Sequence, residues 1–181
     1  GLPMDVILKH EPMTIPTYEP YAANTLPFFL EKKAYQGATG RIYPVPYTDR
    51  LSNKPVDKEY DSYTLENEHV KVVLLPELGG KIHGAVDKHN NYEFIYQNTV
   101  IKPAMVGIAG PWVSGGVEFN WPQHHRPTTF MPLEATPKKN ADGSVTVWMG
   151  EAEPFHRMRG MVGITVYPGR SYVEAKAVVY N

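Results

Sequence analysis

The chain contains no cysteine among its 181 residues. This absence excludes disulfide bonds, thiolate metal ligands and a cysteine nucleophile, and it leaves both secreted or periplasmic and cytoplasmic locations open. The localisation is therefore unknown at this stage. Long apolar runs are also absent, because a membrane-spanning helix needs a stretch of about 18 apolar residues or more. We expect no membrane partner.

An excess of charge of one sign is missing as well. The chain has 18 lysine and arginine residues against 19 aspartate and glutamate residues, for a formal net charge of −1. A protein that binds nucleic acid normally carries a basic face, so we expect no nucleic-acid partner. The glycine pairs Gly79–Gly80 and Gly115–Gly116 do not have the spacing of a phosphate-binding loop. We therefore expect no nucleotide, and no cofactor of any other kind.

Turn-forming and aromatic residues are abundant. Seventeen prolines, fifteen glycines and twelve tyrosines disfavour long helices and favour an all-β fold with many turns. Alternation and turn residues predict an antiparallel meander with strands at residues 63–66, 70–75, 81–87 and 92–96. Two further hairpins, with turns at Asp142-Gly143 and Pro168-Gly169, are predicted from strands at residues 133–137, 144–149, 158–167 and 172–180.

The N-terminal part has a different pattern. Residues 13–29 are rich in proline and tyrosine and predict an extended arm without regular structure, whereas the polar residues 51–60 predict a loop. We divide the chain into an N-terminal arm with edge strands (1–60) and a β-sandwich (61–181), which together form one structural domain. The last expected strand runs up to Asn181, so we expect a sandwich that is incomplete at this end. An open sheet edge of this kind favours a homodimer.

One segment, from Gly110 to Phe130, concentrates chemically active side chains. It reads GPWVSGGVEFNWPQHHRPTTF and follows neither the period of a strand nor that of a helix. Tryptophan faces combined with carboxylate, amide and imidazole groups suit a sugar ring, which has C–H faces and a rim of hydroxyls. The predicted carbohydrate-binding residues are Trp112, Glu118, Asn120, Trp121, His124, His125 and Arg126.

The same segment supplies the candidate catalytic residues, which are His124, His125 and Glu118. An imidazole with an ordinary pKa is able to donate a proton at neutral pH. Neighbouring side chains on an extended strand point to opposite faces, so at most one of the two histidines faces a pocket. Glu118 would act as an acid or base if the tryptophans desolvate it, and otherwise it contacts sugar or pairs with Arg126. The spacing matches no helix-borne metal motif, so we expect no metal.

A second acidic pair, Glu151 and Glu153, has the composition of a glycosidase site but also that of a solvated rim. His156, Arg157 and Arg159 follow directly, and one of them could line the same cleft.

Two motifs carry a resemblance to known families. The segment LPELGGKI at residues 75–82, followed by a hairpin that ends in EFIY, resembles the opening of galactose mutarotase-like (aldose 1-epimerase-like) domains. The nearer resemblance, carried by GPWVSGGVEFN and HHRPTTF within residues 110–130, is to a family of uncharacterised bacterial domains known as DUF5107. It covers roughly residues 60–181. The resemblance to mutarotase-like domains implies an antiparallel β-supersandwich with sugar on a concave face and a general base in a later part of the protein. The resemblance to DUF5107 implies downstream tetratricopeptide repeats.

We therefore predict a carbohydrate-binding β-sandwich domain of a larger carbohydrate-processing protein. One alternative is an aldose 1-epimerase-like or glycoside hydrolase enzyme whose remaining catalytic residues lie downstream. Another is a structural β-domain that packs against repeats. The identity and linkage of the sugar, and whether any reaction is catalysed, stay open.

Overall fold

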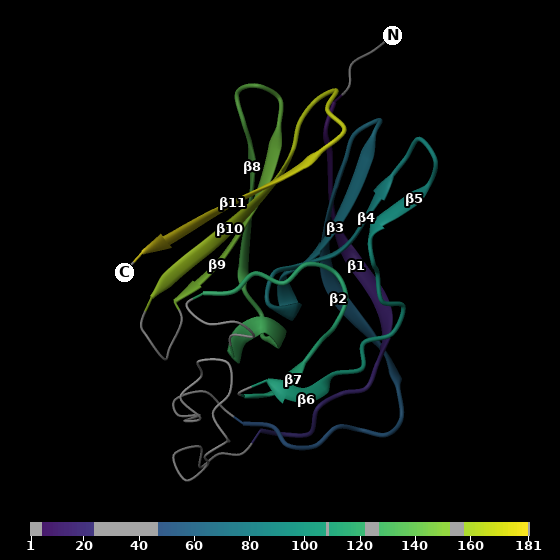
Figure 1. The fold of residues 1–181 in the computed structure, drawn as a ribbon, viewed down its shortest axis with the longest axis vertical. Coiled ribbons are helices and arrows are strands. Elements are labelled where there is room, and N and C mark those ends of the chain that lie inside the picture. Colours follow the sequence, from purple (N-terminus) through teal and green to yellow (C-terminus); the bar gives the residue numbers. More distant parts are fainter. Residues whose placement is uncertain (1–4, 24–46, 108, 122–126, 153–157, 181) are drawn as a thin grey trace.

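A computed structural model of the chain describes residues 5–23, 47–107, 109–121, 127–152 and 158–180. Within these residues, a five-stranded sheet faces a four-stranded sheet, and a two-stranded hairpin lies at one end (Figure 1). This arrangement confirms the predicted antiparallel all-β sandwich. The strands are β1 (Ile7–Thr17), β2 (Val56–Glu66), β3 (Val70–Leu75), β4 (Lys81–Asp87), β5 (Tyr92–Ile95), β6 (Ala104–Gly107), β7 (Gly110–Trp112), β8 (Glu134–Lys139), β9 (Val145–Ala152), β10 (Arg159–Val166) and β11 (Val173–Tyr180). In the described part of the chain, no helix has the length and apolar character needed to cross a membrane.

The first sheet has the order β1-β2-β3-β4-β5, so its strands are neighbours in both sequence and space. β3 and β4 begin and end at the predicted residues because local turn chemistry determines both ends. The carboxamide oxygen of Asn67 accepts hydrogen bonds from the backbone N–H groups of His69 and Val70 at 2.8 and 2.9 Å, which closes the turn before β3. After β3, a 3-10 turn η2 (Pro76–Leu78) ends at Gly79, whose φ is 69°.

The N-terminal prediction is wrong in two places. Residues 13–17 belong to β1 and residues 56–60 belong to β2, and the two strands pair antiparallel from Ile7↔Glu66 to Thr17↔Val56. Proline misled the prediction for β1, because an edge strand tolerates a residue that cannot donate a ladder hydrogen bond. Tyr60 anchors the pair with an exposed fraction of 2%. Residues 1–4 and 24–46 of the predicted N-terminal arm lie outside the described residues.

The second sheet has the order β11-β10-β9-β8 and supplies the other half of the core. Alternation along β9 and β10 directs one set of side chains toward the first sheet and the other set outward. The inward set, which packs against Leu65, Val72 and Leu74 of the first sheet, consists of Val145, Val147, Met149, Val162, Ile164 and Val166. Thr146, Trp148, Met161 and Thr165 occupy the alternate positions and so belong to the outward face.

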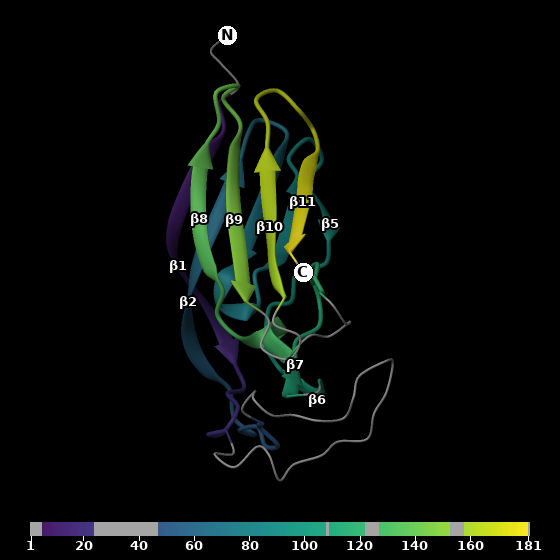
Figure 2. The same cartoon turned by 90° about the vertical axis from the view of Figure 1, so that its left-hand side faces the viewer.

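The sandwich has two different sides. β1 and β8 lie along one side, and β5 and β11 lie along the other (Figure 2). The edge strands of the first side contain prolines, at Pro12 and Pro16 in β1 and at Pro137 in β8. Neither β5 nor β11 contains proline. Proline on an edge strand hinders the addition of another strand, so the two sides differ in their capacity to pair.

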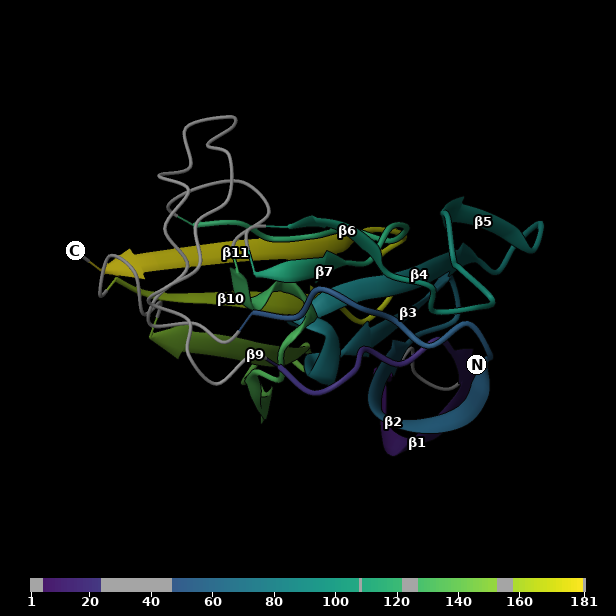
Figure 3. The same ribbon diagram turned by 90° about the horizontal axis from the view of Figure 1, so that it is seen from below.

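The β6–β7 hairpin closes one end of the sandwich (Figure 3). A second apolar cluster lies there and includes Ile15, Tyr60, Leu75, Ile101 and Val113. From β7 the chain returns along β4, where Ile82 and Val117 exchange backbone hydrogen bonds of 3.1 and 2.9 Å. This bridge fixes the segment 113–121, which carries Glu118, Asn120 and Trp121 of the predicted site.

Candidate functional site

Two glycines bring the predicted segment against β4. Gly115 and Gly116 have φ values of 80° and 66°, in the left-handed region that favours glycine. A Cβ atom at Gly116 would lie 2.0 Å from the carbonyl oxygen of Ile82. Gly116 therefore serves a close approach of two backbones, whereas a Cβ atom at Gly115 would meet the side chain of Asn98.

Glu118 joins three of the predicted residues. Its Oε1 accepts a hydrogen bond from Nε1 of Trp112 at 3.0 Å, and its Oε2 accepts one from Nδ2 of Asn120 at 2.9 Å. Trp112 and Glu118 are half-buried, whereas Asn120 is exposed. Both carboxylate oxygens thus help to hold the loop in shape.

Lys81 and His83 lie beneath this loop on β4, with exposed fractions of 4% and 3%. The Nζ of Lys81 donates to the carbonyl oxygens of Val113 and Ser114 at 3.0 and 3.3 Å. Burial lowers the pKa of Lys81 to about 8, and the negative charge of Glu118 opposes this shift. Burial also lowers the pKa of His83 to about 4, with the positive charge of Lys81 acting in the same direction. The buried pair is therefore a cationic anchor for the loop beside a neutral imidazole.

Trp121 is a packing residue in this structure. Its exposed fraction is 5%, and its ring lies against Gly160 of β10, where a Cβ atom would be 2.3 Å from Cε2. Gly160 shares the inward side of β10 with Val162, so Trp121 reaches the strand from the core side. His124, His125 and Arg126 lie outside the described residues. The structure thus brings Trp112, Glu118 and Asn120 together and covers Trp121.

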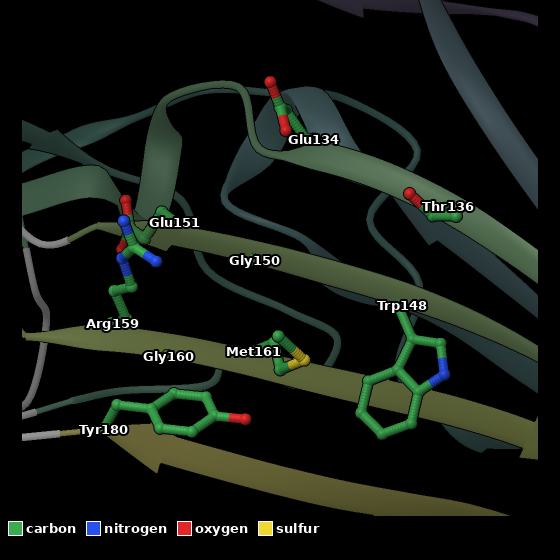
Figure 4. Close-up of a pocket in the computed structure, with 9 residues that line it drawn as sticks. All are labelled: Glu134, Thr136, Trp148, Gly150, Glu151, Arg159, Gly160, Met161 and Tyr180. Atoms are coloured by element: carbon green, nitrogen blue, oxygen red, sulfur yellow. The ribbon is translucent and has the colours of Figure 1, made fainter.

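A cavity lies away from this loop, on the outward face of the β8–β11 sheet (Figure 4). We call it the Trp148 groove; it has a volume of about 610 Å³, and its lining includes Glu134, Thr136, Trp148, Arg159, Met161 and Tyr180. The half-buried indole of Trp148 covers Gly163, its register partner on β10. A Cβ atom at Gly163 would lie 2.8 Å from Cε3 and Cζ3 of that ring. Glycine therefore permits the tryptophan to lie flat on the sheet.

Charged groups line the part of the groove away from this ring (Figure 4). The groove lining includes Glu134 of β8, Glu151 of β9 and Arg159 of β10 (Figure 4). Tyr180 of β11, 54% exposed, adds a second aromatic ring with a hydroxyl. Of the second group named from sequence, Glu151 and Arg159 thus line this groove, whereas Glu153, His156 and Arg157 lie outside the described residues.

Sequence analysis missed Trp148, although a signal was present. In the run Val145 to Met149, the valines and the methionine form one face of a strand, which leaves Thr146 and Trp148 on the other face. A large aromatic residue on the polar face of a strand marks an exposed platform. Among the described residues, no group of three or more His, Asp or Glu side chains is placed to hold a metal ion.

Comparison with known proteins agrees with this architecture. Residues 38–181 match the family described as "Domain of unknown function (DUF5107)". The chain belongs to the DUF5107 family. This DUF5107 chain is also similar to the crystal structure of a TPR-domain containing protein from Parabacteroides distasonis ATCC 8503, with 26% sequence identity and a TM-score of 0.84. The match covers 99% of this chain and 30% of that one, so the chain spans less than a third of the solved protein. The resemblance to DUF5107 predicted from sequence is confirmed.

Proposed function

We propose that this chain is a carbohydrate-binding module of a larger protein, and that it binds sugar in the Trp148 groove. The observation that carries the proposal is the half-buried indole of Trp148 lying flat on Gly163 in the floor of a cavity of about 610 Å³. A flat, solvent-accessible indole offers the apolar surface on which the C–H face of a pyranose stacks.

The surrounding groups supply the polar half of such recognition. Glu134, Thr136 and Arg159 are exposed at the edge of the groove and have the acceptors and donors that sugar hydroxyls require. Apolar walls with a few polar groups are typical of small-molecule sites. The resemblance of LPELGGKI at residues 75–82 to galactose mutarotase-like domains, which bind sugar on a concave sheet face, supports the same ligand class.

A test starts from calorimetric titration of the chain with glucose, galactose, mannose and their linear oligomers. We expect Trp148→Ala to weaken the binding of any sugar that binds the wild type by about tenfold or more. The magnitude follows the stacking of nucleobases on aromatic side chains, which contributes about 1–3 kcal/mol for each base. Trp112→Phe serves as a matched control, because it removes the indole of the loop and leaves the groove intact. Loss of affinity in Trp112→Phe alone would move the proposed site to the loop around Glu118.

A hydrolytic form of this proposal would use Glu134, on the outward face of β8, together with Glu151 near the end of β9. Glycoside cleavage commonly employs a pair of carboxyl groups that flank the scissile bond. Release of new reducing ends from an oligosaccharide by the full-length protein, and its loss in Glu134→Gln and Glu151→Gln, would support catalysis. Aldose epimerisation would instead appear as accelerated mutarotation in polarimetry.

A second candidate function is packing against repeats in a longer protein. Edge strand β5 exposes Tyr92 and Phe94, with exposed fractions of 62% and 42%, and Tyr96 follows it at 71%. Neighbouring exposed aromatics favour a protein contact, and the similar solved protein is a TPR-domain containing protein. If this face packs against repeats, Tyr92→Ser combined with Phe94→Ser will lower the melting temperature of the full-length protein more than that of the isolated chain.

A further inference from the structure

The outward face of the β8–β11 sheet holds a second cavity, next to the Trp148 groove. We call it the hairpin cavity because it lies beside the turn between β8 and β9; its volume is about 350 Å³. Among the described lining residues, Trp148 alone lines both cavities. The indole therefore stands at the boundary between two adjoining spaces on one face of one sheet.

The two cavities follow the strands end to end. β9 contributes Thr146 to the hairpin cavity, Trp148 to both cavities and Gly150 to the groove, at steps of two residues. From Ser144 to Gly150 the strand covers about 20 Å at about 3.3 Å per residue. β8 repeats this order, with Lys138 in the hairpin cavity and Thr136 and Glu134 in the groove. The combined space is elongated along the strands.

The hairpin cavity has a fixed polar wall. Nδ2 of Asn140 donates to Oγ of Ser144 and to Oγ1 of Thr146, both at 3.0 Å. The hydroxyls of Thr146 and Thr165 lie 2.6 Å apart, and Ser144 donates to Asp142 at 2.6 Å. Ser144, Thr146 and Thr165 have exposed fractions of only 2%, 5% and 3%. Their hydrogen-bonded side chains therefore form a rigid polar base beneath the exposed groups of the cavity.

The two cavities therefore differ in chemistry. The groove offers apolar surfaces on Trp148, Met161 and Tyr180, whereas the hairpin cavity offers the exposed amines of Lys138 and Lys176 above its polar base. A monosaccharide would occupy only one of these spaces. A linear chain of sugars would place one ring against the aromatic floor and the next rings along the polar wall.

We propose that the ligand of this face is an extended oligosaccharide or polysaccharide that runs along β9, with a stacking subsite and a polar subsite on either side of Trp148. This inference rests on the proposed function and specifies its ligand class. Linked subsites act on one ligand molecule, so contacts in the second subsite add to affinity without a second cost of association.

The test is isothermal titration of the chain with a monosaccharide, disaccharide, tetrasaccharide and hexasaccharide of each linear series that binds. We expect affinity to rise by about tenfold or more between the monosaccharide and the tetrasaccharide. Lys176→Ala should weaken the tetrasaccharide severalfold and leave the monosaccharide unchanged, whereas Tyr180→Ala should weaken both. Lys71→Ala on β3 and Tyr92→Ala on β5 are matched controls, since both side chains are exposed on the other sheet.

The possible outcomes separate the two proposals. Equal affinity for the monosaccharide and the tetrasaccharide would overturn the extended ligand and leave carbohydrate binding standing. Absence of binding to every saccharide, in a chain whose far-ultraviolet circular dichroism shows a folded β-protein, would overturn both. Length-dependent affinity that Lys176→Ala does not alter would overturn the polar subsite in the hairpin cavity.

Discussion

The six-membered ring of Trp148 lies over Gly163, and the two residues are register partners on neighbouring strands. Because Gly163 has no side chain, the indole of Trp148 fills the space that a Cβ atom would occupy. This relationship gives a test of the groove that leaves the tryptophan itself in place.

Gly163→Ala should lower saccharide affinity by roughly tenfold, because the new methyl group would lie 2.8 Å from the indole and tilt it off the sheet. We expect the free energy of unfolding to fall by about 1 kcal/mol, at the low end for overpacking, since the ring faces solvent on its other side. Titration calorimetry and urea unfolding measure the two effects. Unchanged affinity in Gly163→Ala would contradict the role of the flat indole.

Gly160→Ala provides the contrasting case on the same strand. Its methyl group would lie 2.3 Å from Cε2 of Trp121, a ring with an exposed fraction of 5%. A covered ring has less room to move, so we expect a loss of about 2–3 kcal/mol in the free energy of unfolding. Urea unfolding checks this value, and a smaller loss than in Gly163→Ala would show that Trp121 is loosely packed.

Glu118→Gln should destabilise the loop and spare the groove. The amide retains one acceptor in place of two, so the hydrogen bond from Trp112 or that from Asn120 is lost, at a cost of about 1–3 kcal/mol. Asn120→Ala, which removes a single exposed donor, is the milder control. Saccharide affinity should stay at the wild-type value in both variants. Lost affinity with normal stability would instead identify Glu118 as a sugar ligand.

The lowered pKa of Lys81 predicts that the protein becomes more stable as the pH rises above about 8. The pKa of Lys81 is about 8 in the folded chain against an ordinary value of 10.5, so the unfolded chain binds more protons between these values. The free energy of unfolding should therefore increase from about pH 8 to pH 10.5, by about 3 kcal/mol at most. Lys81→Met should lack this rise, whereas the exposed Lys71→Met should keep it. Urea unfolding of the wild type, Lys81→Met and Lys71→Met across this pH range measures the rise. The tyrosines contribute equally to all three proteins, so their contribution cancels when the wild-type profile is subtracted from that of each variant.

The lowered pKa of His83 predicts that the protein becomes less stable as the solution is acidified. The pKa of His83 is about 4 in the folded chain against an ordinary value of 6.5, so the unfolded chain takes up a proton first as the pH falls. The free energy of unfolding should decrease from about pH 6.5 to pH 4, by about 3 kcal/mol at most. His83→Gln should reduce this decrease, and His10→Gln, at a half-exposed histidine on β1, is the control. An identical acid profile in His83→Gln and wild type would show that the imidazole is hydrated.

Local patterns predicted much of this fold. The limits of β3 and β4 follow from an Asx turn at Asn67 and a glycine at position 79, both of which act within a few residues. Residues 13–17 of β1 escaped prediction because the pairing of β1 with β2 crosses a long stretch of sequence, and because a proline such as Pro16 is tolerated only at an edge. The burial of Trp121 depends on Gly160, a tertiary contact that no local pattern contains. Trp148 was within reach of prediction, since its face on β9 follows from simple alternation.

The unequal sides of the sandwich restrict how copies of this chain associate. Of the described edge strands, β1 and β8 carry prolines and lie together, whereas β5 and β11 lie on the opposite side without them. Open-ended stacking into a fibre requires every molecule to offer two adhesive edges that point in opposite directions. If copies of this chain associate by strand addition, the prolines confine that addition to the β5–β11 side, and it stops at a closed pair.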